Sequence, residues 1–472
     1  MISKGKNLLL VFISLFLIVL SAYPRAGGAG GHHSSDGSGG GSGLGGLIGW
    51  FFLLPGPVQI IIIIAVVAYF AYKYFNKNKS GGTDMSSGRS NGPAGIGNAI
   101  SAEFVAGNPG FEATAFTQKV TTAFMAIQDA WQNKNLSKVR RWISDGVYQR
   151  FNAQFTMMNL LEQTNTLSNI KIKQVRIESA TQEGDYSIIT ASVYFSMDDN
   201  FICKKHPEFD EQFTGDEATE YWTFIKKSGV AEKDLYHSNT CPKCGFPSND
   251  KGGQVSQCES CGTVTYLGDY DWVLCEITQE EDYKRNEARI SAQDPSLQSL
   301  FADKGADFSI QLMEDKASNA VMQYFISKVT HDLKYVRRFT SDELFATIEN
   351  KIKGEDKFVY NRLYLNSVNL VGCVLANNMY YAVFNINYSS MRLKEAPGGR
   401  LAKLDDTVTE RPMQLTLAKK AGAVQKTKLW SFACPSCGAP YTDTTITECT
   451  YCDAKINSSD NDWVMTGLTP GE

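Results

Sequence analysis

The stretch CPKCGFPSNDKGGQVSQCESCG, from Cys241 to Gly262, holds two pairs of cysteines, and two residues separate the members of each pair. The stretch CPSCGAPYTDTTITECTYC, from Cys434 to Cys452, repeats this arrangement. Between the pairs lie 13 residues in the first stretch (245–257) and 11 in the second (438–448). Two C-x-x-C pairs at this spacing are typical of a tetrahedral Zn²⁺ site, because each pair forms a tight turn that directs two sulfurs at one ion.

The sequence therefore predicts two structural zinc ions, one bound by each quartet. Protein sulfur would fill all four coordination positions, which is typical of a structural site and not of a catalytic one. A mononuclear iron site with the same thiolates is one alternative, and redox-active cysteine pairs are another. Grouping in quartets favours a metal over redox chemistry. The eight predicted ligands are Cys241, Cys244, Cys258, Cys261, Cys434, Cys437, Cys449 and Cys452.

The sequence around the two quartets is also duplicated. The offset between their first cysteines, 434 − 241 = 193, brings TFIKKSG (223–229) onto TLAKKAG (416–422). After each quartet the tripeptide DWV begins ten residues beyond the last cysteine, at Asp271 and at Asp462. The resemblance between the two regions therefore extends on both sides of the cysteines.

A further pair of matching stretches lies upstream. LSKVRRWISD (136–145) matches LKYVRRFTSD (333–342) at an offset of 333 − 136 = 197. Matches that are widely spaced and keep the same order indicate a duplicated domain of about 170 residues, longer than the period of solenoid repeats. We expect two tandem copies, each carrying one quartet.

Apolar spacing predicts helices at the start of each copy. A stripe of apolar residues at three- and four-residue spacing indicates a helix with one face packed on a core. Its members in the first copy are Phe116, Val120, Phe124, Ile127 and Trp131. Ser144 and Ser341 stand directly before further helical patterns, where a serine side chain caps a helix N-terminus.

Strand patterns follow the helices in both copies. Residues 170–180 and 186–197 alternate or are rich in β-branched side chains. In the second copy, 363–375 and 379–389 flank Asn377-Asn378, which predicts a hairpin turn. The expected fold class is α+β, with helices on a curved antiparallel sheet and a zinc ribbon inserted between two late strands.

Two apolar segments precede the duplicated region. An uncharged run from Leu8 to Leu20 follows basic residues, which is typical of a signal peptide or signal anchor. The segment 49–73 is uncharged up to its last residue and is long enough to span a bilayer. It is followed by a cluster of basic residues, Lys73, Lys77 and Lys79.

The basic cluster predicts the topology, because positive residues flank the cytoplasmic end of a membrane helix. Everything after residue 73 is then cytoplasmic, where thiolates stay reduced. The expected segments are a signal peptide or signal anchor (1–26), a Gly/Ser-rich tether (27–48), a transmembrane segment (49–73), a flexible linker (74–108), the first copy (109–278, zinc ribbon 241–262), a linker (279–294) and the second copy (295–472, zinc ribbon 434–453).

Charge argues against nucleic acid as a partner. The net charge is −4 and the pI is about 5.9. Acidic residues outnumber basic ones in and just after both zinc ribbons. Phosphate would be repelled there, so we expect no nucleic-acid binding.

The sequence contains no recognisable catalytic motif. Walker A, G-x-S-x-G and H-E-x-x-H patterns are all missing from it. None of the five histidines has an identifiable nucleophile or carboxylate partner, and His206 is expected in an exposed polar loop. We therefore predict no catalytic residues and no enzyme activity.

Two further groups of residues are interpreted as structural. Three isolated cysteines are expected to be small buried apolar residues, namely Cys203, Cys275 and Cys373. Two arginine pairs have an anion as one candidate partner, but pairing with nearby acids is favoured; they are Arg140, Arg141, Arg337 and Arg338.

Residues 108–151 resemble one known family. NPGFEATAFTQKVTTAFMAIQDAWQNKNLSKVRRWISDGVYQRF is similar to the opening of the conserved domain of the mitochondrial inner-membrane translocase subunit 44 and its bacterial relatives. The residues that carry the resemblance are Asn108-Pro109-Gly110-Phe111, Trp131, Leu136, Arg140 and Asp145. The match is good over 108–195 and thinner in the second copy.

The resemblance implies a fold and a role. The family has the nuclear-transport-factor-two-like cone, in which helices and a curved sheet enclose an apolar pocket. Its bacterial members often carry a membrane span before the domain, and the mitochondrial protein is a peripheral membrane scaffold that contacts anionic lipid. No catalytic residues carry over. The duplication and the two zinc ribbons depart from the pattern of the mitochondrial protein.

These observations together predict a membrane-anchored, non-enzymatic scaffold. It would sit in the plasma (inner) membrane with a single span and present both copies to protein partners in the cytoplasm, in protein transport or envelope assembly. The alternative is a module that binds a lipid or another hydrophobic ligand in the apolar cone pocket.

Overall fold

The computed structural model of the chain describes residues 100–247, 255–285, 289–303, 307–396, 400–423, 434, 436–439 and 446–470. These residues belong to one compact unit. The predicted signal segment, tether and transmembrane segment, which end at residue 73, lie outside the described residues. Within the described ranges, no helix combines the length and the apolar character needed to cross a membrane.

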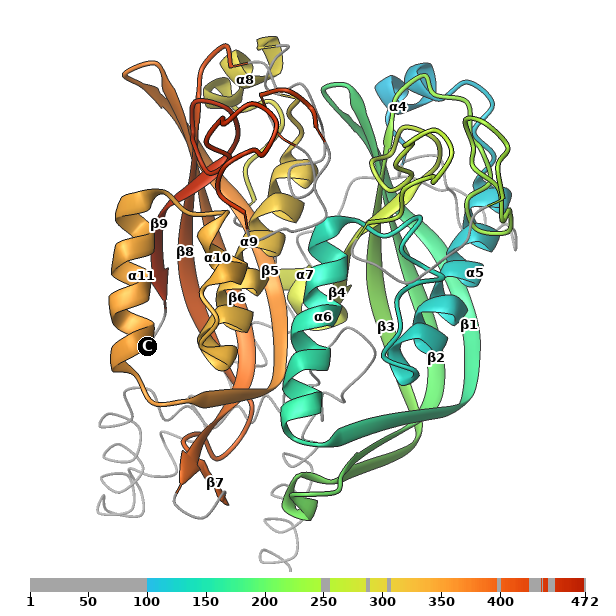
Figure 1. The fold of residues 1–472 in the computed structure, drawn as a ribbon. Coiled ribbons are helices and arrows are strands. Elements are labelled where there is room, and N and C mark those ends of the chain that lie inside the picture. The colour runs from blue at the N-terminus through green and yellow to red at the C-terminus, as the bar shows by residue number, and fades with distance from the viewer. Residues whose placement is uncertain are drawn as a thin grey trace, which may run out of the picture. The chain divides into compact units, whose positions relative to one another are not determined.

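The first repeat, residues 100–279, packs helices on one sheet (Figure 1). Its helices are α4 (Ala102–Gly107), α5 (Ala113–Gln132) and α6 (Asp145–Leu160). Its strands are β1 (Gln163–Glu183), β2 (Tyr186–Cys203), β3 (Glu211–Lys227) and β4 (Val273–Gln279), with the 3₁₀ helix η2 (Pro207–Phe209) between β2 and β3. The strands pair antiparallel in the order β1-β2-β3-β4.

The second repeat, residues 289–470, shows the same order of major elements. Helix α7 (Glu280–Arg285) leads into it. Its helical elements are η3 (Pro295–Leu297), α8 (Gln298–Ala302), α9 (Ile310–Thr330), α10 (Lys334–Arg337) and α11 (Asp342–Gly354). Its strands are β5 (Phe358–Ala376), β6 (Met379–Ala396), β7 (Arg400–Lys403), β8 (Thr409–Lys420) and β9 (Val464–Pro470). The sheet order is β5-β6-β8-β9, and β7 pairs with β6.

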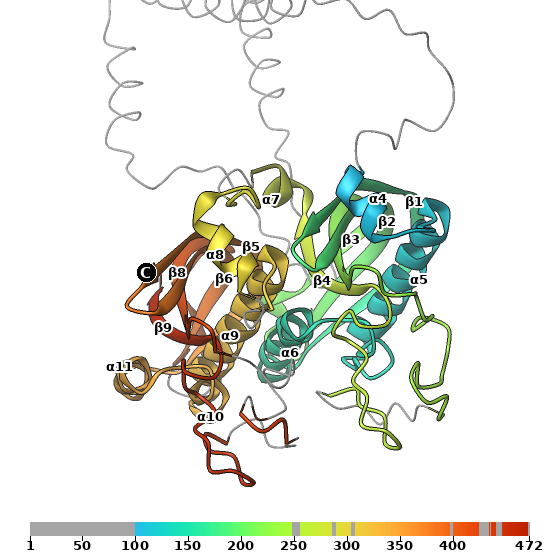
Figure 2. The same ribbon diagram turned by 90° about the horizontal axis from the view of Figure 1, so that it is seen from above.

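The fold is α+β with antiparallel sheets, as predicted. Helices α6, α9 and α11 lie on the same side of the two sheets when the molecule is seen from above (Figure 2). The predicted hairpin turn at Asn377-Asn378 is confirmed, since both residues have positive φ and Ala376 pairs with Met379. Both predicted caps are confirmed, because Ser144 Oγ accepts from Val147 N at 3.1 Å and Ser341 Oγ accepts from Leu344 N at 3.3 Å.

The core of the first repeat is aromatic. All five residues of the predicted apolar stripe are buried on α5. The ring of Phe124 lies 4.7 Å from that of Phe195 on β2 and 5.4 Å from that of Trp222 on β3, measured between centroids. These side chains occupy the space between α5 and the sheet, where the family resemblance implies an apolar pocket.

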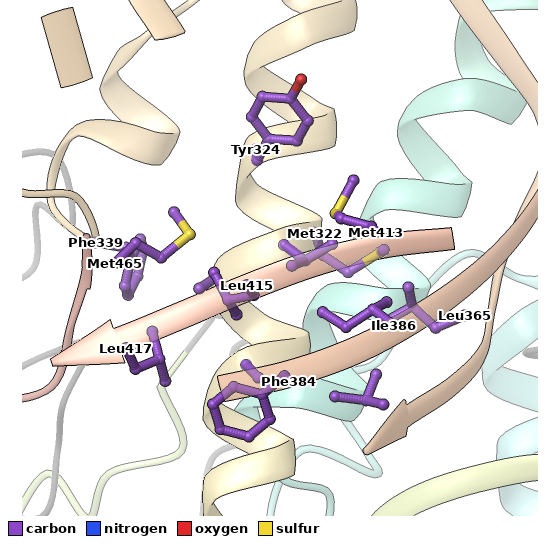
Figure 3. Close-up of a cluster of buried hydrophobic side chains, with 14 of the residues drawn as sticks. Met322, Tyr324, Phe339, Leu365, Phe384, Ile386, Met413, Leu415, Leu417 and Met465 are labelled. Atoms are coloured by element: carbon purple, nitrogen blue, oxygen red, sulfur yellow. The ribbon is translucent and has the colours of Figure 1, made fainter. Parts of the chain in front are cut away.

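The core of the second repeat is mainly aliphatic. Figure 3 shows Phe384 and Ile386 of β6 and Leu415 of β8 gathered beside Met322 of α9. Each of these side chains is at most 1% exposed. Fully burying one such side chain stabilises a fold by roughly 1.5–3 kcal/mol.

Two expected linkers take part in the folded unit. Helix α4 falls in the expected linker 74–108, yet its Phe104 is fully buried in the core of the first repeat. The expected linker 279–294 contains α7, whose Asp282 is buried and accepts from Asn366 Nδ2 of β5 at 3.0 Å. The chain between the repeats is therefore held against the second repeat.

The two repeats pack through α6 of the first and α9 and β5 of the second. Both α6 and α9 bury side chains on several faces. The outer helix α11, which matches α6 in chain order, buries only Leu344, Ile348 and Ile352 among its side chains. A helix that packs between two layers needs buried side chains all round, whereas a terminal helix keeps a polar outer face.

A carboxylate from the second repeat caps α6. Asp315 on α9 accepts hydrogen bonds from Ser144 Oγ and from Gly146 N, the latter at 3.3 Å. One turn further along, Arg150 donates to Ser318 Oγ of α9 at 2.8 Å and to Glu276 of β4 at 3.0 Å. The N-terminal amides of α6 are thus satisfied partly by its own repeat and partly by the other.

The Asp315 cap predicts a pH dependence of stability. Burial raises the pKa of Asp315 from 3.8 to about 7. The folded state therefore keeps a proton that the unfolded state releases, so the contribution of Asp315 to the free energy of unfolding is largest below about pH 4 and falls as the pH rises to 7. One such proton contributes a slope of up to about 1.4 kcal/mol per pH unit.

Urea unfolding of the wild type and of Asp315→Asn across this pH range measures that contribution. We expect the wild type to lose more stability than the variant between pH 5 and 7, while effects common to both proteins cancel. Parallel pH profiles for the two proteins would show that Asp315 titrates normally.

Candidate metal centres

The four C-x-x-C turns share one backbone geometry. In each, the N–H of the residue after the second cysteine donates to the carbonyl of the first, at 2.8 to 2.9 Å. The N–H of the first cysteine donates to the carbonyl of the residue that lies five positions later, at 2.8 to 3.0 Å. These knuckles hold the two sulfurs of a pair on one side of the turn, as the spacing predicts.

The sulfurs of each quartet converge on one point. In the first, Cys241 Sγ lies 3.7 Å from Cys261 Sγ, and Cys244 Sγ lies 3.7 Å from Cys258 Sγ. In the second the corresponding distances are 3.8 Å between Cys434 and Cys452 and 3.7 Å between Cys437 and Cys449. Within each quartet all four sulfurs lie within 4.8 Å of one another.

These distances fit a tetrahedral metal site and not disulfides. Four sulfurs bound at about 2.3 Å to one Zn²⁺ in a tetrahedron lie about 3.8 Å apart. A disulfide would hold two sulfurs about 2.05 Å apart. The eight predicted ligands are therefore brought together in two closed sets of four that could each bind a metal ion. Among the described residues, no other group of three or more His, Cys, Asp or Glu ligand atoms is as compact.

Backbone and hydroxyl donors stabilise thiolate at two of the ligands. Thr263 Oγ1 lies 3.1 Å from Cys261 Sγ, and this contact lowers the pKa of Cys261 to about 6. The N–H of Tyr451 points at Cys449 Sγ at 3.4 Å and lowers the pKa of Cys449 to about 7. Because thiolate is the form that binds metal, both contacts favour metal binding, whereas burial raises the pKa of Cys434 to about 12.

The residue after each C-x-x-C pair adopts a left-handed conformation. Gly245, Gly262 and Gly438 have φ of +73°, +69° and +77°, and Asp453 has φ of +55°. Glycine has no Cβ to clash in this region, whereas other residues are strained by roughly 1–2 kcal/mol. The fourth knuckle therefore carries strain that the other three avoid.

Replacing Asp453 with glycine should relieve this strain. We expect the second site to hold zinc about fivefold more tightly in competition with a chromophoric chelator, which corresponds to about 1 kcal/mol. The matched variant Gly245→Asp should weaken the first site by a similar factor. Equal shifts of the same sign in both variants would contradict the conformational explanation.

Arginine side chains fasten the first ribbon to the first repeat. Arg141, one residue before Trp142, donates to the carbonyl of Ser238 and, at 2.7 Å, to that of Thr240, directly before Cys241. The guanidinium of Arg140 lies 3.5 Å from the ring centre of Tyr266, which follows the ribbon and is buried. Both ends of the ribbon are thus held by adjacent arginines.

The second ribbon is fastened by a different set of contacts. Lys455, two residues after the ribbon, pairs with Asp342 at the start of α11, and Arg337 of α10 donates to the same carboxylate at 2.6 Å. These two cations lower the pKa of Asp342 to about 2, with Lys455 as the larger cause. Asn457 Nδ2 also donates to the carbonyl of Thr340 at 2.9 Å.

The isolated cysteines, the arginines and His206, which the sequence analysis considered, contribute to packing and to ion pairs. All three isolated cysteines are buried, as predicted. Arg140 and Arg337 pair with the nearby acids Asp145 and Asp342, whereas Arg141 binds backbone carbonyls. The prediction for His206 is wrong, because only 8% of this residue is exposed. It precedes η2, whose Phe209 packs in a cluster with Leu393 of the second repeat, a contact that local polarity does not reveal.

Two groups of residues were missed by reasoning from sequence. One is the cap formed by Asp315, which depends on how the repeats pack. The other is a groove beside the N-terminus of α5, lined by the Asn108-Pro109-Gly110-Phe111 turn and by residues 229–232. In the sequence the turn stands out only as part of the family resemblance. The opposite wall of the groove lies about 120 residues later in the chain, so no local pattern links the two walls.

Comparison with known families settles the relationship of the first repeat. A family model described as "Tim44-like domain" matches residues 98–235. Residues 98–235 are a Tim44-like domain. The Tim44-like domain runs from α4 past the end of β3 and stops before the first quartet. It includes the stretch 108–151 on which the resemblance was predicted, so that prediction is confirmed.

Other comparisons add little to the Tim44-like match. No curated protein matches the chain. A solved structure described as "Ntf2 like protein involved in plasmid conjugation" covers 73% of this chain and 96% of its own, at 7% identity and a TM-score of 0.15. A score this low carries no argument about the fold or the role of this protein.

Proposed function

We propose that this protein is a membrane-anchored, non-enzymatic scaffold that binds protein partners at the cytoplasmic face of the plasma (inner) membrane, in protein transport or envelope assembly. The Tim44-like domain at 98–235 is the observation that carries the proposal. Domains of this kind serve protein interaction and transport. The two closed Cys₄ sets, which leave no open ligand position, support a structural and not a catalytic role for the metal.

Zinc is the metal proposed for both sites. In the first it would be held by Cys241, Cys244, Cys258 and Cys261, and in the second by Cys434, Cys437, Cys449 and Cys452. A bound Zn²⁺ would neutralise thiolate charge and cross-link two knuckles. The donor set fits zinc because four thiolates at tetrahedral spacing are among its preferred ligands.

Membrane anchoring is proposed from the sequence of the N-terminal region. The apolar segment 49–73 and the lysines that follow it support a single span with the repeats in the cytoplasm. A reporter fused after Glu472 tests this topology. A cytoplasmic reporter should be active there, and activity of an export-dependent reporter would overturn the topology.

Purification of the full-length protein from native membranes in mild detergent tests the scaffold itself. We expect stoichiometric proteins of transport or envelope assembly to remain bound and to be identified by mass spectrometry. A stoichiometric lipid without any protein partner would instead favour the ligand-binding alternative. That alternative gains no support from the first repeat, where Phe124, Phe195 and Trp222 fill the space between helix and sheet.

A further inference from the structure

A groove opens beside the N-terminus of α5 in the first repeat. It encloses about 480 Å³, which is within the range of about 300–1,000 Å³ typical of ligand sites. One wall is the turn from Gly107 to Glu112 with the first turn of α5, and the other is the segment Gly229 to Glu232 after β3. The groove is separate from both candidate metal centres.

The α5 wall carries unsatisfied polar groups. The N-cap residue of α5 is Glu112, whose side chain makes no capping bond. In the described chain, the N–H groups of Ala113, Thr114 and Ala115 have no acceptor. Asn108, which also lines the groove, is only 6% exposed, and its Oδ1 has no hydrogen-bond partner in the described chain.

The opposite wall is a short irregular segment whose amides have no partner in the described chain. Gly229 N donates to the carbonyl of Gly107 at 2.7 Å, and Lys233 N donates to that of Tyr270 at 2.8 Å. Between these two anchors, the N–H groups of Val230, Ala231 and Glu232 donate to no group of the described chain. The segment belongs to no sheet.

The charges of the groove are balanced within its walls. Lys119 pairs with Glu232 at 2.9 Å and also with the buried Asp271. Lys226 donates to the carbonyl of Val230 at 3.0 Å and lies 3.7 Å from Glu232. Because each cation already has an anionic partner, the groove has no strong preference for a charged ligand. Its remaining surface is apolar, from Phe111, Phe116 and the neighbouring alanines.

The second repeat serves as an internal comparison, since its helix α9 matches α5. There, Ser309 caps the helix, accepting from Leu312 N at 3.0 Å. The side chains before the helix close the space, because Leu300 and Phe308 are buried and the rings of Phe301 and Phe308 lie 5.0 Å apart. The unsatisfied groups therefore belong to the first repeat in particular and are not required by the fold.

We propose that this groove binds an extended, uncharged peptide segment of a protein partner. A peptide backbone offers carbonyls for the free amides of the two walls and carries no charge. A simple anion would meet the carboxylates of Glu112 and Glu232, which line the groove. An apolar side chain of the peptide would pack between Phe111 and Val230. The inference rests on the scaffold function proposed above and names the site and the chemistry of the partner.

Selection from a phage-displayed library of random dodecapeptides on the full-length protein in detergent supplies the probe. A synthetic copy of a selected peptide should protect the amides of 113–115 and 230–232 from hydrogen exchange. Ala115→Trp, which fills the groove, should weaken its binding at least about tenfold, as loss of a central contact does. The matched variant Thr121→Trp, at an exposed position of α5 outside the groove lining, should bind within about twofold of the wild type.

Three outcomes would overturn the inference: failure of the library to yield a binder, protection elsewhere in the protein, or undiminished binding by a folded Ala115→Trp protein. Hydrogen exchange on the wild type decides the matter if Ala115→Trp does not fold. If the Ala115→Trp protein still retains native partner proteins, the proposed scaffold function is supported, but the groove is not the site that binds these partners. If the selected peptide binds in the groove but no native partner protein is found, only the proposed scaffold function is contradicted.

Discussion

Replacing Cys241 and Cys244 with serine should lower the zinc content from two ions per chain to one and unfold the first ribbon. The described part of the ribbon has almost no core of its own, because the nearby buried apolar cluster of Val264 and Tyr266 follows it in the chain. Metal binding contributes about 10–16 kcal/mol to small structural zinc domains. Without it the 22-residue ribbon has too few apolar contacts to offset its conformational entropy.

Metal analysis and hydrogen exchange of the same protein measure this effect. Exchange should accelerate over residues 235–247 and 255–270, while the second site keeps its zinc. The mirror variant, with Cys434 and Cys437 replaced by serine, should lose the other ion. As a control, Cys373→Ala removes a buried cysteine outside both quartets and should keep two ions. A metal-free double variant whose first ribbon stays protected would refute the role of the metal.

Replacing Gly146 with alanine should destabilise the protein by about 3–5 kcal/mol, at the upper end for overpacking. A Cβ at this position would lie 2.6 Å from the backbone oxygen of Asp315 and would also collide with its carboxylate. To relieve this clash, α6 must move away from α9. That movement breaks the cap on α6 and loosens the main contact between the repeats.

Gly354→Ala provides a matched control for that substitution. Gly354 ends α11, and a Cβ there would meet no heavy atom within 4 Å. Alanine has the higher helix propensity, so this variant should be neutral or slightly more stable, by up to about 1 kcal/mol. Chemical denaturation of the two variants side by side measures the difference. Equal stabilities would show that the repeats do not pack tightly at Gly146.

Much of each repeat was predictable because its signals are local. The apolar stripe of α5, the serine caps of α6 and α11 and the Asn377-Asn378 turn all depend on residues a few positions apart. The metal sites belong to the same class, since C-x-x-C spacing and the following glycine already determine the turn. Asp453 shows the limit of the pattern, because the knuckle forms although its fourth left-handed residue is not glycine.

The packing of the repeats against each other was not predictable in the same way. Nothing in the patterns of α6 and α11 near their caps says that one packs against the other repeat and that the other faces outward. Asp315 and Ser144 are 171 residues apart in the chain, and their hydrogen bond exists only when both repeats are folded. His206 was misplaced for the same reason, as Leu393 and its neighbours cover that end of the first repeat.

By itself the sequence determined that this protein has two Cys₄ sets, α+β elements and a Tim44-like first domain, because these depend on spacing, periodicity and short motifs. The tertiary structure alone decided which helices are interior and that Asp315 caps a helix of the other repeat. It also decided that a groove with free amides remains in the first repeat while the matching space in the second is filled. Such features join residues far apart in the chain, and only close packing brings those residues together.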